Sequence, residues 1–188
     1  MIGIDEVGRG CWAGPLLVVA YRQTSKLPAG VGDSKSVSKK RRQALQFDLE
    51  IAGDIGEGWV SNQEIDAAGL TGAMRLGVAR ALAAITAGDD EPIIMDGAIN
   101  YCSRNFTNVQ TVIDGDALYP VVGAASITAK VRRDACMAAL AKDYESYGFE
   151  RHVGYGTAAH LAALKVHGVC DLHRLSFKPV NAFVEPVS

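Results

Sequence analysis

The sequence predicts a single α/β domain over residues 1–188, and three observations support this prediction. Short apolar runs alternate with segments of helical composition, which is the pattern of a sheet covered by helices. Hydrophobic residues make up 48% of the 188, enough for one substantial core. The sequence shows no internal repeat, low-complexity tract or linker. The segment from about 145 to 188 is expected to pack on the domain as a small helical lobe.

The first half of the chain predicts three strands and two helices. The first two strands are expected to form a hairpin, because a glycine-containing stretch separates them. Ser38 can cap a basic helix that runs through Ile51, and Ser61 with Glu64 matches the capping-box pattern. Strong helix composition then covers Ala73–Ala87. The expected strands are Met1–Glu6, Leu16–Tyr21 and Gly56–Val60.

The second half predicts two more strands, each of which runs into an acidic residue. Pro92–Met95 leads into Asp96, and Val109–Ile113 leads into the acidic stretch 114–116. This recurrence is the main organising feature of the sequence. Two helices are expected in the remainder, over Val121–Tyr144 and over Thr157–His167 with Thr157 as the N-cap.

Composition excludes several classes of protein. Nineteen Lys and Arg residues against 21 Asp and Glu give a net charge of −2, so no overall positive field draws the protein to a polyanion or an anionic membrane. The four cysteines show neither paired nor zinc-ligand spacing and are expected to be reduced thiols. The sequence offers no membrane span, no signal peptide and no exposed apolar helix face, so a cytoplasmic monomer without membrane contact is expected.

Four acidic residues at or just beyond predicted strand ends mark the candidate site: Asp5, Glu6, Asp96 and Asp116. In an open α/β sheet, ligand clefts form beyond the carboxyl ends of the strands. Carboxylates gathered there repel one another unless a cation lies between them, and hard divalent ions are their usual partners. The set therefore predicts Mg²⁺ or Mn²⁺ rather than Zn²⁺, since the four histidines fall late in the chain and none pairs with cysteine at ligand spacing.

Two structural considerations weigh against this hypothesis. Acidic residues often end strands because they suit turns and solvent, and for any one of the four that explanation is the stronger. In addition, adjacent strand residues point to opposite faces of a sheet. Asp5 and Glu6 can therefore share a site only if the strand ends or bulges there, which the glycine at position 8 makes plausible.

A glycine turn directly follows the first two carboxylates. Gly8, Arg9 and Gly10 allow the backbone to approach a ligand closely and to offer peptide groups to it. Taken alone, such a turn is more often a tight hairpin with an exposed arginine. The longer stretch G-I-D-E-V-G-R-G-C-W-A-G-P, residues 3–15, resembles the opening motif of the type 2 ribonucleases H (RNase HII). Similar motifs follow in the family's order: D-S-K at 33–35, M-D-G at 95–97, G-D-A at 115–117, A-A-S-I-T-A-K-V at 124–131, G-Y-G-T at 154–157 and H-R-L-S-F at 173–177.

The resemblance implies an RNase H-like fold, with a mixed central sheet flanked by helices. It also implies hydrolysis of the RNA strand of RNA–DNA hybrids and incision 5′ to single ribonucleotides embedded in duplex DNA. Two divalent ions, Mg²⁺ or Mn²⁺, would activate water and stabilise the leaving oxygen. The residues that the resemblance assigns to metal binding and catalysis are Asp5, Glu6, Asp96 and Asp116. The role of nearby Asp134 stays open.

Distinguishing RNA from DNA requires contacts to the 2′-hydroxyl, which is both a donor and an acceptor. The resemblance assigns these contacts to the turn of Gly8, Arg9 and Gly10 and to Tyr155, whose phenol could hydrogen-bond the hydroxyl and stack on a neighbouring sugar or base. Without the resemblance, Tyr155 would be interpreted as a packing or turn residue. Ser126 and Lys130 lie on one helix face near the acidic residues and, with Lys35, complete the expected substrate contacts.

Basic clusters elsewhere are expected to contact phosphates, although a solvated face explains the first of them equally well. They are Lys35 with Lys39–Arg42, Lys130 with Arg132 and Arg133, and Arg174 with Lys178. Three positions depart from the family pattern by lacking positive charge: Ser36, Asp114 and Val153. These departures are expected to affect affinity more than chemistry, and Asp114 adds a negative charge beside Asp116.

The sequence is also compatible with three other interpretations. A type 3 ribonuclease H usually has an N-terminal extension and a glutamate as its fourth acidic ligand, whereas this chain has Asp116 and begins four residues before Asp5. A non-catalytic RNA–DNA hybrid-binding module could keep the fold, although its unpaired carboxylates would weaken binding to phosphate. A cysteine hydrolase built on Cys11 or Cys136 lacks a base placed beside either thiol.

Overall fold

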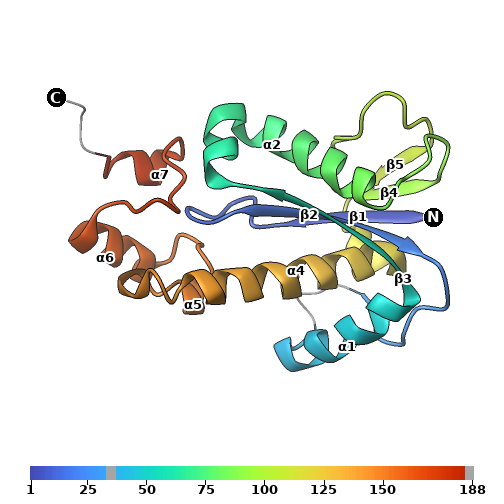
Figure 1. The fold of residues 1–188 in the computed structure, drawn as a ribbon, viewed down its shortest axis with the longest axis horizontal. Helices are drawn as coiled ribbons and strands as arrows, with labels where there is room; N and C mark the ends of the chain where they lie inside the picture. The colour runs from blue at the N-terminus through green and yellow to red at the C-terminus, as the bar shows by residue number, and fades with distance from the viewer. Residues whose placement is uncertain (33–36, 185–188) are drawn as a thin grey trace.

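A five-stranded mixed sheet forms the centre of the protein, with strand order β3-β2-β1-β4-β5 (Figure 1). The computed structural model describes residues 1–32 and 37–184. β1 pairs antiparallel with β2, and β2 with β3, whereas β4 runs parallel to both β1 and β5. The mixed sheet and the hairpin of the first two strands are confirmed. The strands are β1 (Ile2–Val7), β2 (Leu16–Gln23), β3 (Gly53–Val60), β4 (Ile93–Asp96) and β5 (Val109–Val112).

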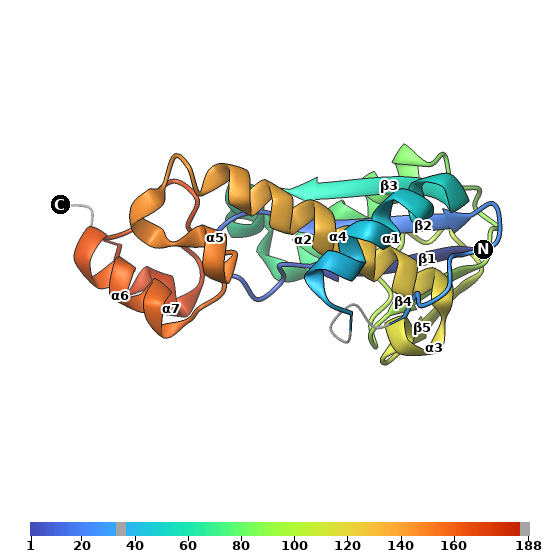
Figure 2. The same ribbon diagram turned by 90° about the horizontal axis from the view of Figure 1, so that it is seen from below.

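Helices cover both faces of the sheet. α2 lies on one face, and α1 and α4 lie on the other (Figure 1). The helices that follow α4 gather at one end of the molecule, where they form the predicted helical lobe (Figure 2). The helices are α1 (Lys39–Ala52), α2 (Asn62–Ala84), α3 (Gly115–Leu118), α4 (Pro120–Leu140), α5 (Phe149–His152), α6 (Ala158–His167) and α7 (Lys178–Asn181), with a 3₁₀ turn η1 (Glu145–Tyr147) before α5.

Strand β2 is buried on both faces and therefore divides the core in two. Leu16, Val18 and Ala20 pack with the residues of α2. Leu17, Val19 and Tyr21 pack with α1 and α4. This alternation follows from the two-residue period of a strand. A further hydrophobic cluster, with Phe149 and Tyr147 at its centre, joins the end of α4 to the C-terminal lobe.

Local capping signals set the helix starts where the sequence predicts them. The Ser38 hydroxyl accepts a hydrogen bond from the Arg41 amide at the start of α1. Ser61 and Glu64 form the predicted capping box at the start of α2. Thr157 caps α6, as expected. Of the residues described, no helix combines the length and apolarity needed to cross a membrane.

The structure differs from the predictions most clearly in α2, α4 and α3. α2 contains a break at Gly69, whose φ of 67° lies in the left-handed region, and the helix ends at Ala84 rather than Ala87. The helix expected over Val121–Tyr144 begins at Pro120 and ends at Leu140, and Gly123 does not interrupt it. The short helix α3 is not predicted by the sequence, because its four residues are too few to show a helical period.

Candidate active site

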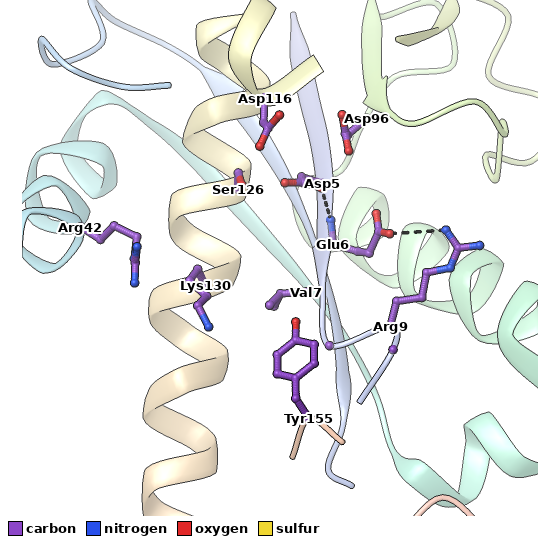
Figure 3. Close-up of a pocket in the computed structure, with 12 residues that line it drawn as sticks. Asp5, Glu6, Val7, Arg9, Arg42, Asp96, Asp116, Ser126, Lys130 and Tyr155 are labelled. Carbon is purple, nitrogen blue, oxygen red and sulfur yellow. Dashed lines mark hydrogen bonds and ion pairs between the residues drawn. The ribbon is translucent and has the colours of Figure 1, made fainter. Parts of the chain in front are cut away.

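The first two carboxylates lie on β1 at the point where that strand loses one neighbour. β1 pairs with β4 only as far as Ile4, whereas its pairing with β2 continues regularly through Asp5, Glu6 and Val7. The strand thus neither ends nor bulges at Glu6. The expectation that Asp5 and Glu6 can share a site only where the strand ends or bulges is therefore wrong. Asp5 faces α4 and Glu6 faces the other side of the sheet. The β4 side of the strand is open there, and although the Glu6 side chain points toward Arg9, both residues line one pocket (Figure 3).

The other two acidic residues reach the same pocket from neighbouring elements. Asp96 is the last residue of β4, as predicted. Asp116 lies just beyond the end of β5, as predicted, and the structure places it on the short helix α3. The Asp96 Oδ1 accepts a hydrogen bond of 2.7 Å from the Gly115 amide, which ties the start of α3 to the end of β4. The pocket has a volume of about 400 Å³.

The Asp5 carboxyl group is strongly perturbed by its surroundings. Burial raises its pKa well above the ordinary value, and the negative charges of Glu6 and Asp96 raise it further. Hydrogen bonds from the Ser126 side chain and from the Glu6 amide, the latter 2.7 Å long, act in the opposite direction. A positive charge placed among these carboxylates would relieve their repulsion.

The donor set fits a hard divalent cation, because all of its members are carboxylates. In the described ranges 1–32 and 37–184, however, no three acidic, histidine or cysteine side chains are already drawn together closely enough to form a metal cage. Glu6 instead reaches toward Arg9, at 3.8 Å, and Asp96 binds the Gly115 amide. Four mutually repelling carboxylates have no reason to close up without a cation, so this open arrangement agrees with the chemistry of the donors.

The glycine turn lies beside the acidic residues. Gly8, Arg9 and Gly10 all line the pocket, as expected. Gly8 has φ of 88°, and a Cβ there would lie 2.2 Å from Nε of the buried Arg133. Only glycine therefore allows the backbone to pass this close to the arginine. Arg9 and Gly10 are exposed at the pocket's rim.

Tyr155 reaches the pocket from the C-terminal lobe, and its hydroxyl end points toward Val7 (Figure 3). Its hydroxyl also interacts with the buried Cys11 thiol. The backbones of the two segments are paired, since the Trp12 amide donates to the Gly154 carbonyl at 2.8 Å. Residues 8–15 and 153–155 thus form one structural unit, although about 140 positions separate them in the sequence.

Buried histidines lie behind Tyr155. The His160 Nδ1 lies 3.0 Å from the Tyr155 carbonyl, and its Nε2 lies 3.0 Å from the His173 Nε2. The His173 Nδ1 accepts a hydrogen bond from the Cys170 amide. These partners assign one proton to each ring, with His173 donating to His160 and His160 donating to the carbonyl. Burial lowers the pKa of both histidines, to about 4 for His173.

Of the remaining residues predicted to contact substrate, some line the pocket and one lies outside the described residues. Ser126 and Lys130 line the pocket from α4, as expected. The Lys130 Nζ lies 2.8 Å from Asp134, which gives that acidic residue a role in orienting the lysine. Arg42 of the first basic cluster also lines the pocket, and its selection from five neighbouring basic residues required the structure. Lys35 lies outside the described residues.

The phosphate contacts expected of Arg133 and Arg174 are wrong. Both side chains are 0% exposed and bind backbone carbonyls inside the protein. Arg132 is exposed, but it pairs with Glu50 at 2.7 Å and with Glu57 at 3.3 Å. Nothing in the sequence signals two buried arginines, since arginine is rarely buried without an acidic partner.

Two of the three departures from the family pattern lie within the described residues. Asp114 is exposed, does not line the pocket and adopts φ of 56° at the start of α3. Val153 has φ of 44°, and its carbonyl accepts a hydrogen bond from Arg133. Ser36 lies outside the described residues. Asp114 is therefore not among the groups that surround Asp116 in the pocket.

Comparison with known proteins identifies the family. Residues 2–180 match the family model described as Ribonuclease HII. The ribonuclease HII of Erythrobacter litoralis is 41% identical over 187 residues, covering 96% of this chain and 88% of the relative. That of Endomicrobium trichonymphae is 42% identical over 186 residues, covering 97% and 87%. RNase HII in a PCNA:RNase HII complex from Archaeoglobus fulgidus superposes with a TM-score of 0.79, at 26% identity and 94% coverage of each chain.

These matches distinguish among the interpretations left open by the sequence. The family model and both curated relatives are of type 2, so the type 3 interpretation is set aside. Cys11 and Cys136 are both described as free thiols whose pKa is raised by burial, the opposite of what a nucleophilic thiolate needs. From the site and these matches together, the chain belongs to the ribonuclease HII family of metal-dependent endoribonucleases, which hydrolyse the RNA strand of RNA–DNA hybrids.

Proposed function

We propose that the protein cleaves RNA–DNA hybrids, and incises 5′ to single ribonucleotides in duplex DNA, at the pocket of Figure 3. One observation carries the proposal. Four carboxylates from β1, β4 and α3 line a single pocket that also contains a glycine turn and a tyrosine. The catalytic and metal-binding residues proposed are Asp5, Glu6, Asp96 and Asp116. Mg²⁺ or Mn²⁺ held by them would supply an activated water and stabilise the leaving oxygen.

The chain's own residues prepare this pocket for an anionic substrate. Ser126 and the Glu6 amide hold the Asp5 carboxyl group in place between β1 and α4. Asp134 holds the Lys130 ammonium group at the pocket's edge, where a phosphate of the substrate can pair with it. Lys35 remains a candidate for a further phosphate contact.

Recognition of the 2′-hydroxyl is assigned to the backbone of Gly8, Arg9 and Gly10 and to the Tyr155 phenol. Backbone amides and a phenol can satisfy both the donor and the acceptor capacity of that hydroxyl. Tyr155 is 39% exposed, so its ring face is also available to stack on a sugar or base.

The proposed setting is the cytoplasm, with the protein acting as a monomer in ribonucleotide excision repair and DNA replication. Its four cysteines are free, which suits a reducing compartment. The expected partners are RNA–DNA hybrids and DNA with embedded ribonucleotides.

The experiment that tests the proposed function follows the cleavage of a labelled DNA duplex that contains one ribonucleotide. Wild type should incise 5′ to the ribonucleotide with Mg²⁺ or Mn²⁺ and lose activity with a chelator. Asp96→Asn should lower kcat/KM by at least about 100-fold, because even residues that only support a metal ligand contribute about 10- to 100-fold. Tyr155→Phe should lower it by about 10-fold through one lost hydrogen bond.

Asp114→Asn is the matched control, since it removes a nearby exposed carboxylate that does not line the pocket. Its activity should stay within about two-fold of wild type. No incision by folded wild type with either metal would refute the proposal for this substrate. Tight binding without incision would then support the hybrid-binding module instead.

A further inference from the structure

The Arg174 side chain is buried next to the glycine turn and binds the turn through hydrogen bonds to its backbone. Its Nη1 donates a hydrogen bond of 2.9 Å to the carbonyl of Arg9. Its Nε and Nη2 both donate to the carbonyl of Gly14, at 3.1 and 2.9 Å. One guanidinium thereby fixes two points of the loop between β1 and β2. The backbone amide of Arg174 also donates a hydrogen bond of 2.8 Å to the Trp12 carbonyl.

A second buried arginine fixes the rest of the same loop. Arg133 donates to the carbonyls of Pro15 and Ala13, and its Nη1 donates to the carbonyl of Val153 at 2.8 Å. It therefore joins the loop to the segment that carries Tyr155. The two arginines together hold the turn and the tyrosine in one arrangement.

Neither guanidinium has a carboxylate partner within the described part of the chain. Burying a cation without a counter-ion is costly, and burial and the nearby Arg133 lower the pKa of Arg174 to about 10. A residue that served stability alone would be better replaced by an apolar side chain of similar size. The compensation visible in the structure is the set of carbonyls that the guanidinium holds, together with the ring of Phe177, whose centroid lies 5.2 Å from the Arg174 Cζ.

Fixing the Arg9 carbonyl also sets the direction of the Gly10 N–H, because both belong to the same peptide group. In a trans peptide the C=O and N–H groups point in opposite directions. With its carbonyl directed inward to Arg174, the peptide between Arg9 and Gly10 directs the Gly10 N–H away from the interior. That amide makes no hydrogen bond to the backbone among residues 1–32 and 37–184. Gly10 lines the pocket, so its N–H is available to a substrate oxygen.

We propose that Arg174 is a positioning residue for ribonucleotide recognition, which acts by aiming the Gly10 amide at the substrate's 2′-hydroxyl. This inference rests on the proposed function, because it assumes that the glycine turn contacts that hydroxyl. Lysine at this position would keep the charge, but its single nitrogen cannot reproduce the forked contacts to Arg9 and Gly14. Charge and geometry can therefore be separated by one substitution.

The test measures discrimination between two duplexes by fluorescence anisotropy with Mg²⁺, in an Asp96→Asn background that leaves the substrate uncut. The quantity is the Kd for an all-DNA duplex divided by the Kd for the same duplex with one ribonucleotide. Arg174→Lys should reduce this ratio by about five- to ten-fold, the effect of one hydrogen bond. The control Arg151→Lys changes an arginine that is 86% exposed in the same lobe, and the ratio should not change.

Each result has a distinct meaning. An unchanged ratio in folded Arg174→Lys would overturn the inference while leaving 2′-hydroxyl recognition intact. A ratio of one in the Asp96→Asn reference itself would refute recognition of the hydroxyl, and with it the inference. A uniform loss of affinity for both duplexes would assign Arg174 a structural role only, which also overturns the inference.

Hydrogen exchange of the unsubstituted protein covers the case in which Arg174→Lys does not fold. If Arg174 holds the turn, the amides of 11–14 should open together with those of 172–174 as urea is raised below the unfolding transition. Rapid exchange of the turn while 172–174 stays protected would contradict the proposal without any variant.

Discussion

Acidification should weaken the fold through the buried pair His160 and His173. His173 is 1% exposed and faces His160, Tyr147 and the Cys170 thiol, with His152 close behind. None of these groups carries a negative charge at neutral pH that would stabilise a protonated ring. The folded protein therefore keeps His173 neutral, with its pKa lowered from 6.5 to about 4 by burial and by His160.

The magnitude follows from the difference between the folded and unfolded states. Below pH 6.5, His173 takes up a proton in the unfolded chain, whereas in the folded chain it stays neutral down to about pH 4. The unfolded state then binds more protons, so the free energy of unfolding falls as the pH falls through this window. At 1.36 kcal/mol per pH unit, His173 alone should cost about 2 kcal/mol by pH 5. His160, whose pKa is also lowered by burial, adds a loss of the same sign.

Urea denaturation followed by tryptophan fluorescence at pH 7.5, 6.5, 5.5 and 5.0 would measure this loss. Asp5 acts in the opposite direction, because its raised pKa makes the folded state take up a proton first. The useful quantity is therefore the difference between wild type and His173→Asn, in which the contribution of Asp5 cancels. Between pH 7.5 and 5.0, the free energy of unfolding should fall by about 2 kcal/mol more in wild type than in His173→Asn. The exposed His167, replaced by Asn, serves as the control and should follow wild type.

Parallel stability curves for wild type and His173→Asn would refute the reasoning, because they would mean that position 173 contributes no proton uptake on unfolding. The same data test the assigned hydrogen-bond chain, since a His173 that is already protonated at neutral pH could not accept from the Cys170 amide.

The remaining predictions concern packing, capping and thiol chemistry. Gly58→Ala should lower the free energy of unfolding in urea by about 3 kcal/mol, because its Cβ would lie 1.9 Å from the Gly77 carbonyl oxygen. Gly32→Ala should be neutral, because its Cβ would meet no atom of residues 1–32 and 37–184 within 4 Å. Ser61→Ala should cost about 1 kcal/mol through the lost capping box, measured in the same way. Cys11, buried and with a raised pKa, should resist iodoacetamide in native protein by mass spectrometry, with activity retained; rapid labelling would contradict its burial.

The sequence predicted features that depend on short-range signals. Helix starts at Ser38, Ser61 and Thr157 were recognisable because a capping side chain and the amides that it binds lie within three residues of each other. The acidic residues could be grouped because strand ends in this type of sheet meet at one edge. The role of these residues as metal ligands stays a prediction, which the cleavage assay with Asp96→Asn tests.

What could not be predicted depends on contacts between distant segments. Glu6 shares a pocket with Asp5 only because β4 stops pairing with β1 after Ile4, and strand lengths of this kind are decided by tertiary packing. Arg133 and Arg174 look like surface cations in the sequence, because their carbonyl partners lie between 20 and 165 positions away. Composition and spacing carry no information about such partners.

The pairing of residues 12 and 13 with 154 and 173 affects the order in which the site forms while the chain is being synthesised. The carboxylates of β1 leave the ribosome long before the residues that position the glycine turn. A nascent chain could assemble the sheet and α4, yet its loop after β1 would lack both Arg174 and the Tyr155 segment. The loop closes over a long sequence separation and so forms late. Selective nuclease activity should thus begin only when translation has passed residue 174.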